Sequence, residues 1–411
     1  MHLSDLRVAL FNYICAKQTG KQLVVRIEDT EKERTIEGKD HDILDMLELF
    51  GISYSQLYYQ SNNFKYHLQF ASTLLDKKRA FICFCSEKEL EAKREKAKAE
   101  GKAYHYDGTC ENLSNEEILN TPKPFVIRMK KPVSAFSFED QIKGEISFEP
   151  DTVDAFVIMK ADKYPTDIFA SACDDMLQGI TTIIRNEKHM TNTPRQELIR
   201  RNIGYAQEIL HAHLPMMLND DSSVRWLLDQ GFMPEALLNY LILLGNHTPV
   251  EIFTLEEAIS WFDITAISKF PMSFEIEKLR FINKEHIKRM SDMELSKRIG
   301  YACDNIGKLA KLYTEKVSTT HEIKQKIDAL FAKKEPYAAF ENESNLLQKL
   351  ILTAPYFETF DEFIAYLSEK SALRGDPFFK PLRFWLSGAD DGLELAFVYP
   401  LIKNYLKEIV R

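Results

Sequence analysis

Apolar residues recur at helical spacing in the first segment of the chain, which predicts a helix over residues 4–18. Ser4 or Asp5 can cap this helix, and Gly20 ends it. The run LVVRIED over residues 23–29 turns from apolar to acidic, which is typical of a buried strand that ends in a loop. A second helical pattern covers residues 36–50. Helix, strand and helix in succession indicate an α/β layer.

The pattern then changes along the chain. Residues 62–98 are helical at both ends with FICFCS between them, and strand alternation follows in residues 123–132, AFSFED, GEISFEP and residues 154–166. A helix is predicted over residues 193–210, with Thr193 as its cap and Pro194 in its first turn. From Ser222 onward almost every segment is helical in pattern, as in PEALLNYLILLG. The sequence therefore predicts an α/β first half and an all-α second half.

Length and composition narrow the class of protein. At about 150 residues per domain, 411 residues predict two to four domains, and 45% hydrophobic with 28% charged residues is typical of a globular chain. The net charge of −9 excludes a generally basic nucleic-acid coat but allows a local basic face. Six cysteines are too few for a disulfide scaffold and favour a reducing compartment. No run of eighteen apolar residues and no secretory signal pattern occurs in the sequence.

A dense run of charge, RIEDTEKERTIEGKDHDI, begins at Arg26 directly after the first predicted strand. Ligands usually bind at strand ends in open α/β sheets. Glu28 and Asp29 could hold an amino group there. The alternative is a solvated acidic loop with a helix cap at Thr30.

Three cysteines form the second candidate site. Cys83 and Cys85 are followed, twenty residues later, by Tyr106 and Cys110. Three thiolates and one oxygen could make a closed tetrahedral zinc site, and His105 is an alternative fourth ligand. The other interpretation is three small apolar residues near a hairpin. Cys15, Cys173 and Cys303 lie in helical or apolar runs and are expected in the core.

Basic and histidine residues give weaker signals. Arg200 with Arg201, and the segment KEHIKR over residues 284–289, could meet a phosphate backbone, although a solvated helix face is the better interpretation of each cluster taken alone. The histidines His189, His211 and His213 lack metal-ligand spacing and are expected to be structural or at the surface. No P-loop, G-x-S-x-G or H-E-x-x-H motif is present.

Taken in order, several segments resemble a bacterial glutamyl-tRNA synthetase, a class I aminoacyl-tRNA synthetase. They are LRVALFNYICAK, RIEDTEKERTIEG, CFCSEKELEAKREKAKAEGKAYHYDGTC, KPFVIRMKKP, YPTDIFASACDDMLQGITTIIRNEKH, NTPRQELIRR, DQGFMPEALLNYLILLGN and FFKPLRFWLSG. The resemblance covers essentially the whole chain. It implies a Rossmann-type catalytic domain with an inserted acceptor-binding domain, followed by helical stem-contact and anticodon-binding domains. The implied ranges are 1–80 and 151–220 for the catalytic domain, 81–150 for the zinc-bearing insertion, 221–305 for the stem-contact domain and 306–411 for the anticodon domain.

The resemblance also implies a reaction. Glutamate attacks ATP, accompanied by Mg²⁺, to give glutamyl-adenylate, and the 3′ end of tRNA(Glu) or tRNA(Gln) then takes the acyl group. The protein would be a cytoplasmic monomer without a membrane partner and with one structural Zn²⁺. The implied residues are Glu28, Tyr164, Asp167, Ser171 and Arg185 for substrate, His2, Ser4 and Glu187 for ATP, His2 and Asp5 at the catalytic HIGH positions, and Cys83, Cys85, Tyr106 and Cys110 for the metal.

The sequence departs from the family pattern where ATP should bind. The family's first strand precedes its HIGH motif, whereas this sequence starts directly at that motif, which reads His2-Leu3-Ser4-Asp5. Asp167 replaces the aromatic floor of the amino-acid pocket and would repel a glutamate carboxylate. The family's KMSKS loop lies between the segments LPMMLN and SSVRWLLDQGF; here Asn219 is followed directly by Asp220-Asp221-Ser222, and about ten residues, including both loop lysines, are missing.

These departures leave alternatives open. The chain is expected to be a glutamate–tRNA ligase, and the alternative is a catalytically silent tRNA-binding paralogue. A third hypothesis, an enzyme that glutamylates another acceptor, is disfavoured by the all-α second half. An edited or artificial sequence would also explain the pattern.

Overall fold

The structure of this chain is a computed structural model that describes residues 1–30, 36, 38–220, 222–389 and 391–411. Part of the charged segment after Arg26 therefore lies outside the described residues. Two compact units divide the chain. Unit 1 comprises Met1–Asp220, Ile242–Pro249 and Glu256–Phe274, and unit 2 comprises Asp221–Leu241, Val250–Leu255 and Glu275–Arg411. The predicted division into five domain ranges stays a prediction.

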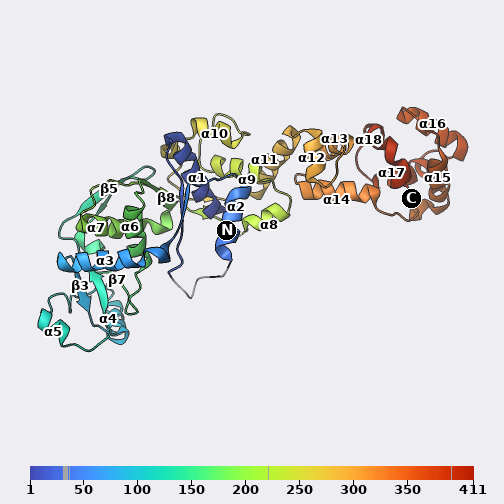
Figure 1. Cartoon of the computed structure of the whole chain (residues 1–411). Coiled ribbons are helices and arrows are strands. Elements are labelled where there is room, and N and C mark those ends of the chain that lie inside the picture. Colours follow the sequence, from blue (N-terminus) through green and yellow to red (C-terminus); the bar gives the residue numbers. More distant parts are fainter. Residues whose placement is uncertain (31–35, 37, 221, 390) are drawn as a thin grey trace. The chain divides into compact units, whose positions relative to one another are not determined.

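The elements of the first 220 residues alternate between helices and strands (Figure 1). In chain order they are α1 (Leu3–Thr19), β1 (Val24–Ile27), α2 (Lys39–Leu49), β2 (Gln56–Tyr59), η1 (Gln60–Asn63), α3 (Phe64–Asp76), β3 (Ala80–Cys83), α4 (Glu87–Ala99), α5 (Asn115–Leu119), β4 (Val126–Met129), β5 (Phe136–Asp140), β6 (Gly144–Phe148), η2 (Pro150–Thr152), β7 (Val157–Met159), α6 (Asp167–Leu177), β8 (Thr182–Asn186), η3 (Glu187–Asn192), α7 (Thr193–Ile203), β9 (Leu210–Leu214) and β10 (Met217–Leu218).

Helices dominate the rest of the chain, as the sequence predicts. They are α8 (Val224–Asp229), α9 (Pro234–Leu243), α10 (Leu255–Trp261), η4 (Ile264–Ala266), α11 (Ile276–Arg289), α12 (Asp292–Arg298), α13 (Asp304–Tyr313), α14 (Thr320–Phe331), η5 (Ala338–Phe340), α15 (Glu341–Thr353), α16 (Phe360–Ser371), α17 (Asp376–Ser387), α18 (Leu395–Ile402), η6 (Lys403–Tyr405) and α19 (Leu406–Ile409). One short strand, β11 (Met272–Ser273), pairs with β10 inside unit 1.

Helix α1 follows directly from its sequence. Its apolar residues, among them Leu6, Leu10 and Ile14, share one buried face. The helix stops at Gly20, whose φ of 64° suits glycine and whose N–H bonds back to Ala16 and Lys17 carbonyls. The predicted cap needs correction: His2 is the N-cap, and the carboxylate of Asp5 accepts its backbone N–H at 3.1 Å.

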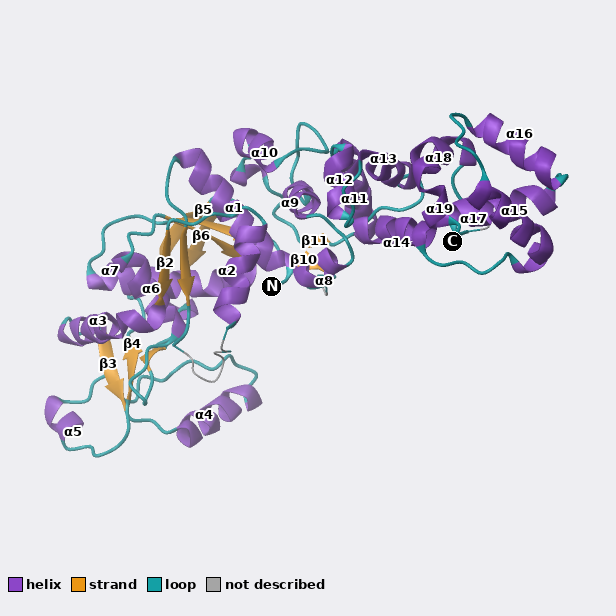
Figure 2. Cartoon of the chain, turned by 45° about the vertical axis from the view of Figure 1, so that its right-hand side comes forward, coloured by secondary structure: helices purple, strands orange, loops and turns teal. Residues whose placement is uncertain are grey.

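Parallel strands joined by helices bear out the α/β prediction. Strand β1 pairs with β2 across α2, and β8 pairs with β9 across α7. Strand β9 also meets β5, whose hairpin partner β6 completes the strand order β6–β5–β9–β8. Figure 2 shows β2, β5 and β6 in orange near α1, α6 and α7. The carboxyl ends of β1 and β8 carry the acidic and basic residues that the sequence singled out.

A smaller sheet, in the order β3–β4–β7, forms the far end of unit 1 near α4 and α5 (Figure 1). Helices α3, α6 and α7 pack against it through a core that includes Leu74, Phe169 and Ile199. Strand β7 belongs to this sheet, although the predicted boundary at residue 150 assigned it to the catalytic part.

Two segments differ from the sequence prediction. The helix predicted over residues 193–210 ends at Ile203, because Gly204 adopts a φ of 100° and caps it. The residues that follow include β9, which is a buried parallel strand rather than a helical turn. Asn192 is the cap of α7, and Thr193 and Pro194 lie in its first turn. The pattern of residues 204–210 is apolar at too few positions to separate the two states.

Candidate active site

Two of the predicted substrate residues are in contact just after β1, and a third lies near the carboxyl end of β8. The hydroxyl of Ser171, on α6, donates to Glu28 Oε1 at 2.9 Å. An Arg26 nitrogen lies 3.8 Å from the same oxygen. Arg185 is the penultimate residue of β8, and the charges of Asp175 and Glu28 act to raise its pKa against the effect of burial. A carboxylate and a guanidinium near one strand edge can hold the two opposite charges of an amino acid.

Arg185 is fixed by residues that the sequence did not single out for this role. Its Nε donates to His213 Nε2 at 3.2 Å, and one terminal nitrogen donates to Thr193 Oγ1 at 2.5 Å. His213 Nδ1 in turn donates to the buried Asp140 carboxylate at 2.6 Å. This bond assigns the proton to Nδ1 and leaves Nε2 as an acceptor for Arg185. Burial lowers the pKa of Arg185 to about 10.

A second buried network stands behind the loop that follows β1. The fully buried Asp174 carboxylate accepts bonds from His67 at 2.8 Å, Gln60 at 3.0 Å and Asn63 at 2.9 Å. Gln60 also accepts a bond from Thr30 at 3.0 Å. Burial acts to raise the pKa of Asp174, but the bonds from His67 and Gln60 outweigh it and hold that pKa below the ordinary value. Among the described contacts, Thr30 thus anchors the loop through Gln60.

Both carboxylate oxygens of Asp29 are bonded within the protein. Its two oxygens accept the backbone N–H of Ser61 at 2.8 Å and the Ser61 hydroxyl at 2.7 Å. Of the two acidic candidates after β1, Glu28 is therefore the one oriented toward Ser171 and Arg26.

The amino end of α1 is bonded to an acidic side chain. The backbone N–H of Ser4 donates to Asp220 Oδ2 at 3.0 Å, while the other Asp220 oxygen is buried without a described partner. His2 and Asp5 are exposed beside it. Helix amino ends attract anions such as phosphate, and here a carboxylate from the end of unit 1 takes that place.

The remaining predicted substrate and ATP residues, Glu187, Tyr164 and Asp167, have different surroundings. Glu187 is bonded to Lys143 at 2.5 Å and to the backbone N–H of Met216 at 2.9 Å. Tyr164 packs against Phe64 with ring centres 5.1 Å apart, and Asp167 is exposed at the start of α6. The structure describes no contact that joins these three residues to Glu28.

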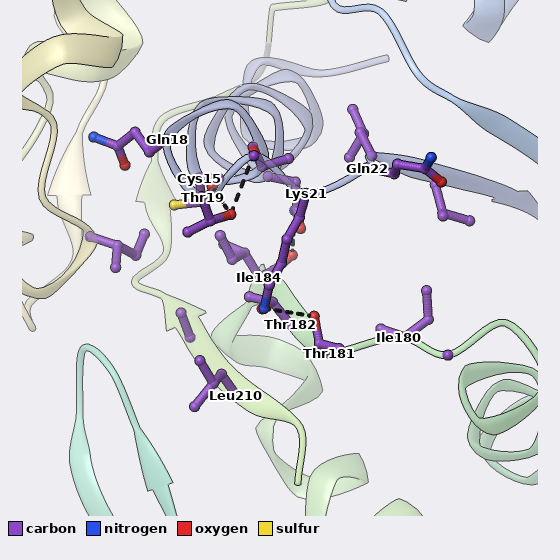
Figure 3. A pocket seen from close by; sticks show the side chains of 18 of the residues that line it. Cys15, Gln18, Thr19, Lys21, Gln22, Ile180, Thr181, Thr182, Ile184 and Leu210 are labelled. Atoms are coloured by element: carbon purple, nitrogen blue, oxygen red, sulfur yellow. Dashed lines mark hydrogen bonds between the residues drawn. The ribbon is translucent and has the colours of Figure 1, made fainter. Parts of the chain in front are cut away.

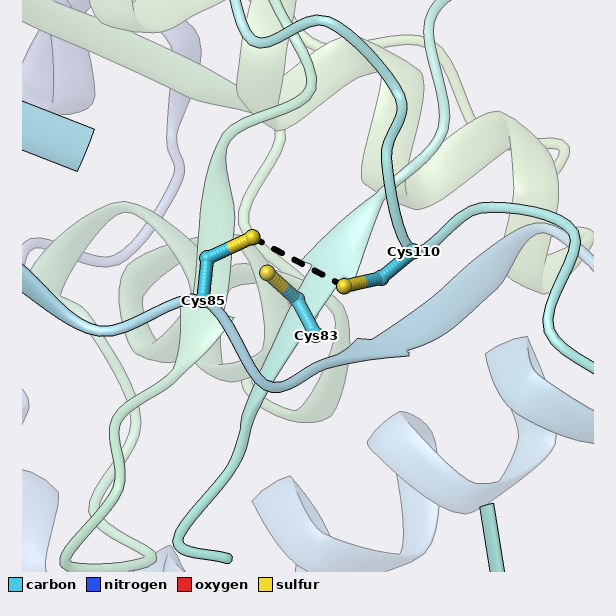
Figure 4. Close-up of side chains that lie close together, drawn as sticks. All are labelled: Cys83, Cys85 and Cys110. Carbon is cyan, nitrogen blue, oxygen red and sulfur yellow. Dashed lines mark hydrogen bonds between the residues drawn. The ribbon is translucent and has the colours of Figure 1, made fainter. Parts of the chain in front are cut away.

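The structure brings the three cysteines of the predicted metal site together (Figure 4). The sulfurs of Cys83, Cys85 and Cys110 all lie within 4.8 Å of one another, and those of Cys85 and Cys110 are 3.7 Å apart. The Tyr106 hydroxyl lies 3.3 Å from the Cys83 sulfur and 3.5 Å from the Cys85 sulfur. Zinc–sulfur bonds of about 2.3 Å in a tetrahedron place sulfurs about 3.8 Å apart, so this donor set fits Zn²⁺.

The pKa values of Cys83 and Cys85 are shifted in opposite directions. Burial opposes ionisation of Cys83, but bonds to Tyr106 and the charge of Arg128 leave its pKa below the ordinary value. Burial raises the pKa of Cys85 to about 11 and raises that of Tyr106 further. A cation bound among the sulfurs would favour all the ionised forms.

Arg200, Cys15 and Cys303 differ from their predictions, whereas His211 and His213 agree with the structural alternative. Arg200 is not part of a solvated face or a free phosphate contact: it is buried and bonded to Asp175 at 3.2 Å and to Glu197 at 2.5 Å. His211 and His213 are buried structural residues, paired with Glu197 and Asp140. Cys173 is in the core as predicted, whereas Cys15 and Cys303 are only partly buried.

Comparison with known proteins identifies the family. Residues 1–281 match the family model described as tRNA synthetases class I (E and Q), catalytic domain. The chain belongs to this family. Glutamate–tRNA ligase 1 of Campylobacter jejuni strain 81-176 is 50% identical over 421 positions, covering 100% of this chain and 97% of the relative. The corresponding enzyme of Campylobacter curvus is 51% identical over 420 positions with the same coverage.

Solved structures agree on the fold of this synthetase chain. A glutamate tRNA ligase from Elizabethkingia meningosepticum, crystallised with its amino acid, superposes with a TM-score of 0.82 at 23% identity and covers 100% of this chain and 96% of that one. A second from Elizabethkingia anophelis gives a TM-score of 0.80 at 24% identity, with the same coverage. The fold prediction of a class I synthetase is confirmed. No helix among the described residues is long and apolar enough to cross a membrane.

Proposed function

We propose that this chain is a glutamate–tRNA ligase that activates glutamate with ATP and Mg²⁺ and transfers it to tRNA(Glu) or tRNA(Gln) in the cytoplasm, as a monomer. The observation that carries the proposal is the hydrogen bond between Ser171 and Glu28 just after β1, in a chain about 50% identical to glutamate–tRNA ligases over its whole length. The relatives named above are all ligases, and none favours the silent paralogue.

Different residues would bind the different charged groups of glutamate. Glu28 would hold the glutamate amino group, and Arg185 would pair with its side-chain carboxylate, oriented by His213 and Thr193. The α-carboxylate then attacks the α-phosphorus of ATP, pyrophosphate leaves, and a terminal ribose hydroxyl of tRNA attacks the resulting carbonyl. Tyr164 and Asp167 would border the amino-acid pocket.

ATP would approach the amino end of α1, where His2 and Ser4 lie, with Glu187 nearby. The Asp220 carboxylate that bonds Ser4 must then move aside for phosphate. Mg²⁺ would screen the phosphate charge.

Zn²⁺ would be held by Cys83, Cys85, Cys110 and Tyr106. It would fix the segment around Tyr106 against β3 and take no part in the chemistry. Ranges 81–150, 221–305 and 306–411 would contact the tRNA acceptor end, stem and anticodon.

A charging assay tests the proposal. The full chain is incubated with total bacterial tRNA, glutamate, ATP and Mg²⁺, and acid gels report the acylated tRNA. An ATP-dependent shift is expected. Arg185→Lys keeps the charge but loses the planar fork, so it is expected to raise the KM for glutamate at least tenfold and leave the KM for ATP unchanged. Filter retention of tRNA without any ATP-dependent charging would instead support the silent paralogue.

A further inference from the structure

The side chain of Arg26 bonds two residues of α6 and approaches the acid that follows β1. Its Nη1 donates to Asp175 Oδ1 and to Gln178 Oε1, both at 3.0 Å. Its Nη2 lies 3.8 Å from Glu28 Oε1, the oxygen that also accepts the Ser171 hydroxyl. One largely buried guanidinium therefore connects Glu28 to the interior of unit 1.

The partners match in spacing along β1 and α6. Arg26 and Glu28 are two positions apart in an extended segment, so their side chains share one face and lie about 6.6 Å apart along the strand. Asp175 and Ser171 are four positions apart on α6, so they share one helix face and lie about 6 Å apart along its axis. Because the two steps are nearly equal, both contacts form together when the helix runs opposite to the strand.

A contact before β1 continues this series. The Lys21 ammonium donates to the Thr181 hydroxyl at 3.1 Å, in the turn between α6 and β8 (Figure 3). From Lys21 through Arg26 to Glu28, the chain advances along β1 while the bonded partners move backward from Thr181 into α6. The three contacts fix β1 against α6, and Arg26 is the central one.

Asp175 is held from its other side by α7. Its Oδ2 accepts a bond from Arg200 Nη1 at 3.2 Å, and Arg200 also pairs with Glu197. Both Asp175 and Arg200 are buried. Burial acts to lower the pKa of Arg26, but the charges of Asp175 and Glu28 outweigh it and raise that pKa. Arg26 is therefore cationic and rests on a carboxylate that does not move freely.

The charges of this series alternate. Glu197 balances Arg200, and Asp175 balances Arg26, so these two pairs carry no net charge. The negative charge of Glu28, at the half-exposed end of the series, is left for a cation from outside. Among the residues that the structure describes, only Oε1 of Glu28 is bonded, which leaves Oε2 to accept a bond. One such oxygen suits one primary ammonium group.

We propose that Arg26 is the positioning residue for the amino group of the substrate: held by Asp175 and Gln178, it fixes Glu28 so that Oε2 faces the ammonium group. This inference rests on the proposed function, in which Glu28 holds the glutamate amino group. Arg26 would act only through Glu28 and would touch no substrate atom. A residue that merely supports the fold would instead weaken every ligand of the site alike.

Two ligands that differ only in the amino group, glutamate and glutarate, test the inference. Their dissociation constants for the full chain are measured by titration calorimetry, and the ratio of the two constants gives the preference for the amino group. The wild-type chain is expected to prefer glutamate about tenfold, since one bond to a charged group contributes that much.

Arg26→Gln is expected to lower this preference about fivefold and to change the glutarate constant by less than about twofold. Asp175 keeps Arg200 as its partner in this variant, so no buried carboxylate loses its only cation. Arg26→Lys keeps the charge but offers a single nitrogen, so its preference should be intermediate. The lysine variant gives the same comparison if the glutamine variant does not fold, which urea titration reports.

A matched control and a double variant separate positioning from general stability. Arg79→Gln, at an exposed arginine of the same unit, should leave both constants unchanged. Glu28→Gln alone should remove the preference for glutamate. Adding Arg26→Gln to it should lower the preference no further, because two residues that act through one contact are not additive.

Three results would overturn the inference. A preference for glutamate that persists in folded Arg26→Gln would do so and would leave the proposed function intact. Equal weakening of both ligands in that variant would show a purely structural role. Equal binding of the two ligands by the wild-type chain would also overturn the proposed role of Glu28.

Discussion

Replacing Asp140 with asparagine is expected to destabilise the sheet around β5 and β9 by about 3–5 kcal/mol. The Asp140 carboxylate is fully buried. It accepts four hydrogen bonds: from His213 Nδ1 at 2.6 Å, and from the backbone N–H groups of His213 at 3.0 Å, Ile142 at 3.0 Å and Lys143 at 2.8 Å. An asparagine amide offers one oxygen, and its NH₂ group would face donors on the other side. Two lost bonds to a charged acceptor cost about 1.5–3 kcal/mol each.

Hydrogen exchange in a peptide that spans β9 measures this loss directly as a change in opening free energy. Asp151→Asn is the matched control, because Asp151 carries the same charge with a side chain 95% exposed and is expected to change nothing measurable. A change in Asp140→Asn below about 0.5 kcal/mol would refute the reasoning, because the four bonds would then contribute little.

The pH dependence gives an independent check. Burial acts to raise the pKa of Asp140, but the bonds from His213 and the backbone outweigh it, so the folded pKa lies below the ordinary value. A carboxyl whose folded pKa is lowered stabilises the protein above the unfolded value of about 4 and loses that contribution as the pH falls through the folded pKa. The stability difference between the two proteins, followed by urea titration, should therefore be full at pH 7 and shrink below pH 4.

Three further predictions concern other parts of the chain. Gly307→Ala should destabilise unit 2 by about 3 kcal/mol in urea titrations, because the new Cβ would lie 1.8 Å from the Asp292 carbonyl oxygen. Lys308→Ala, on the exposed face of the same helix, should be nearly neutral, and equal unfolding midpoints for the two variants would contradict this packing. Cys110→Ser should reduce bound zinc, measured by metal analysis, to less than about 0.2 equivalents, whereas Cys303→Ser should retain the metal. Equal metal content in both variants would exclude the cluster of Cys83, Cys85 and Cys110 as the zinc site. Asp220→Asn should tighten ATP binding in calorimetry by several-fold, because it removes a negative charge from the amino end of α1, and unchanged or weaker binding would show that Asp220 does not compete with phosphate.

Much of the fold could be predicted from the sequence because its signals are local. The stripe of α1, the apolar run of β1 and the helical second half each depend on residue spacing. The four candidate metal ligands were also visible in the sequence, since they lie within 28 positions of one another, and the structure brings the three sulfurs among them within 4.8 Å. Strand β9 was missed, because a short buried strand next to a helix gives no period that separates the two.

The buried hydrogen-bond networks that position the candidate site residues could not be predicted in the same way. Asp140 lies 73 positions from His213, and Asp174 lies 107 positions from His67. Only the folded sheet and helices bring these partners together. The sequence does not distinguish a buried aspartate from an exposed one. Arg200 was taken for a surface cation for this reason. Glu28 was predicted from its place after the first strand and Arg185 through the family resemblance, and both places agree with the general position of ligand sites in α/β sheets.

The chain leaves unit 1 at Asp220 and returns to it twice, through residues 242–249 and 256–274. Those returning segments supply the Leu244 carbonyl that Arg7 bonds at 2.9 Å and the partner strand of β10. During synthesis, the amino-terminal unit therefore cannot close when its first 220 residues have left the ribosome. At about 5–20 residues per second, the next 54 positions take about 3–11 s, during which the α/β part of the nascent chain still lacks these segments. The interval gives chaperones a defined window in which to bind, and a ribosome stalled within it would hold an unfinished catalytic body.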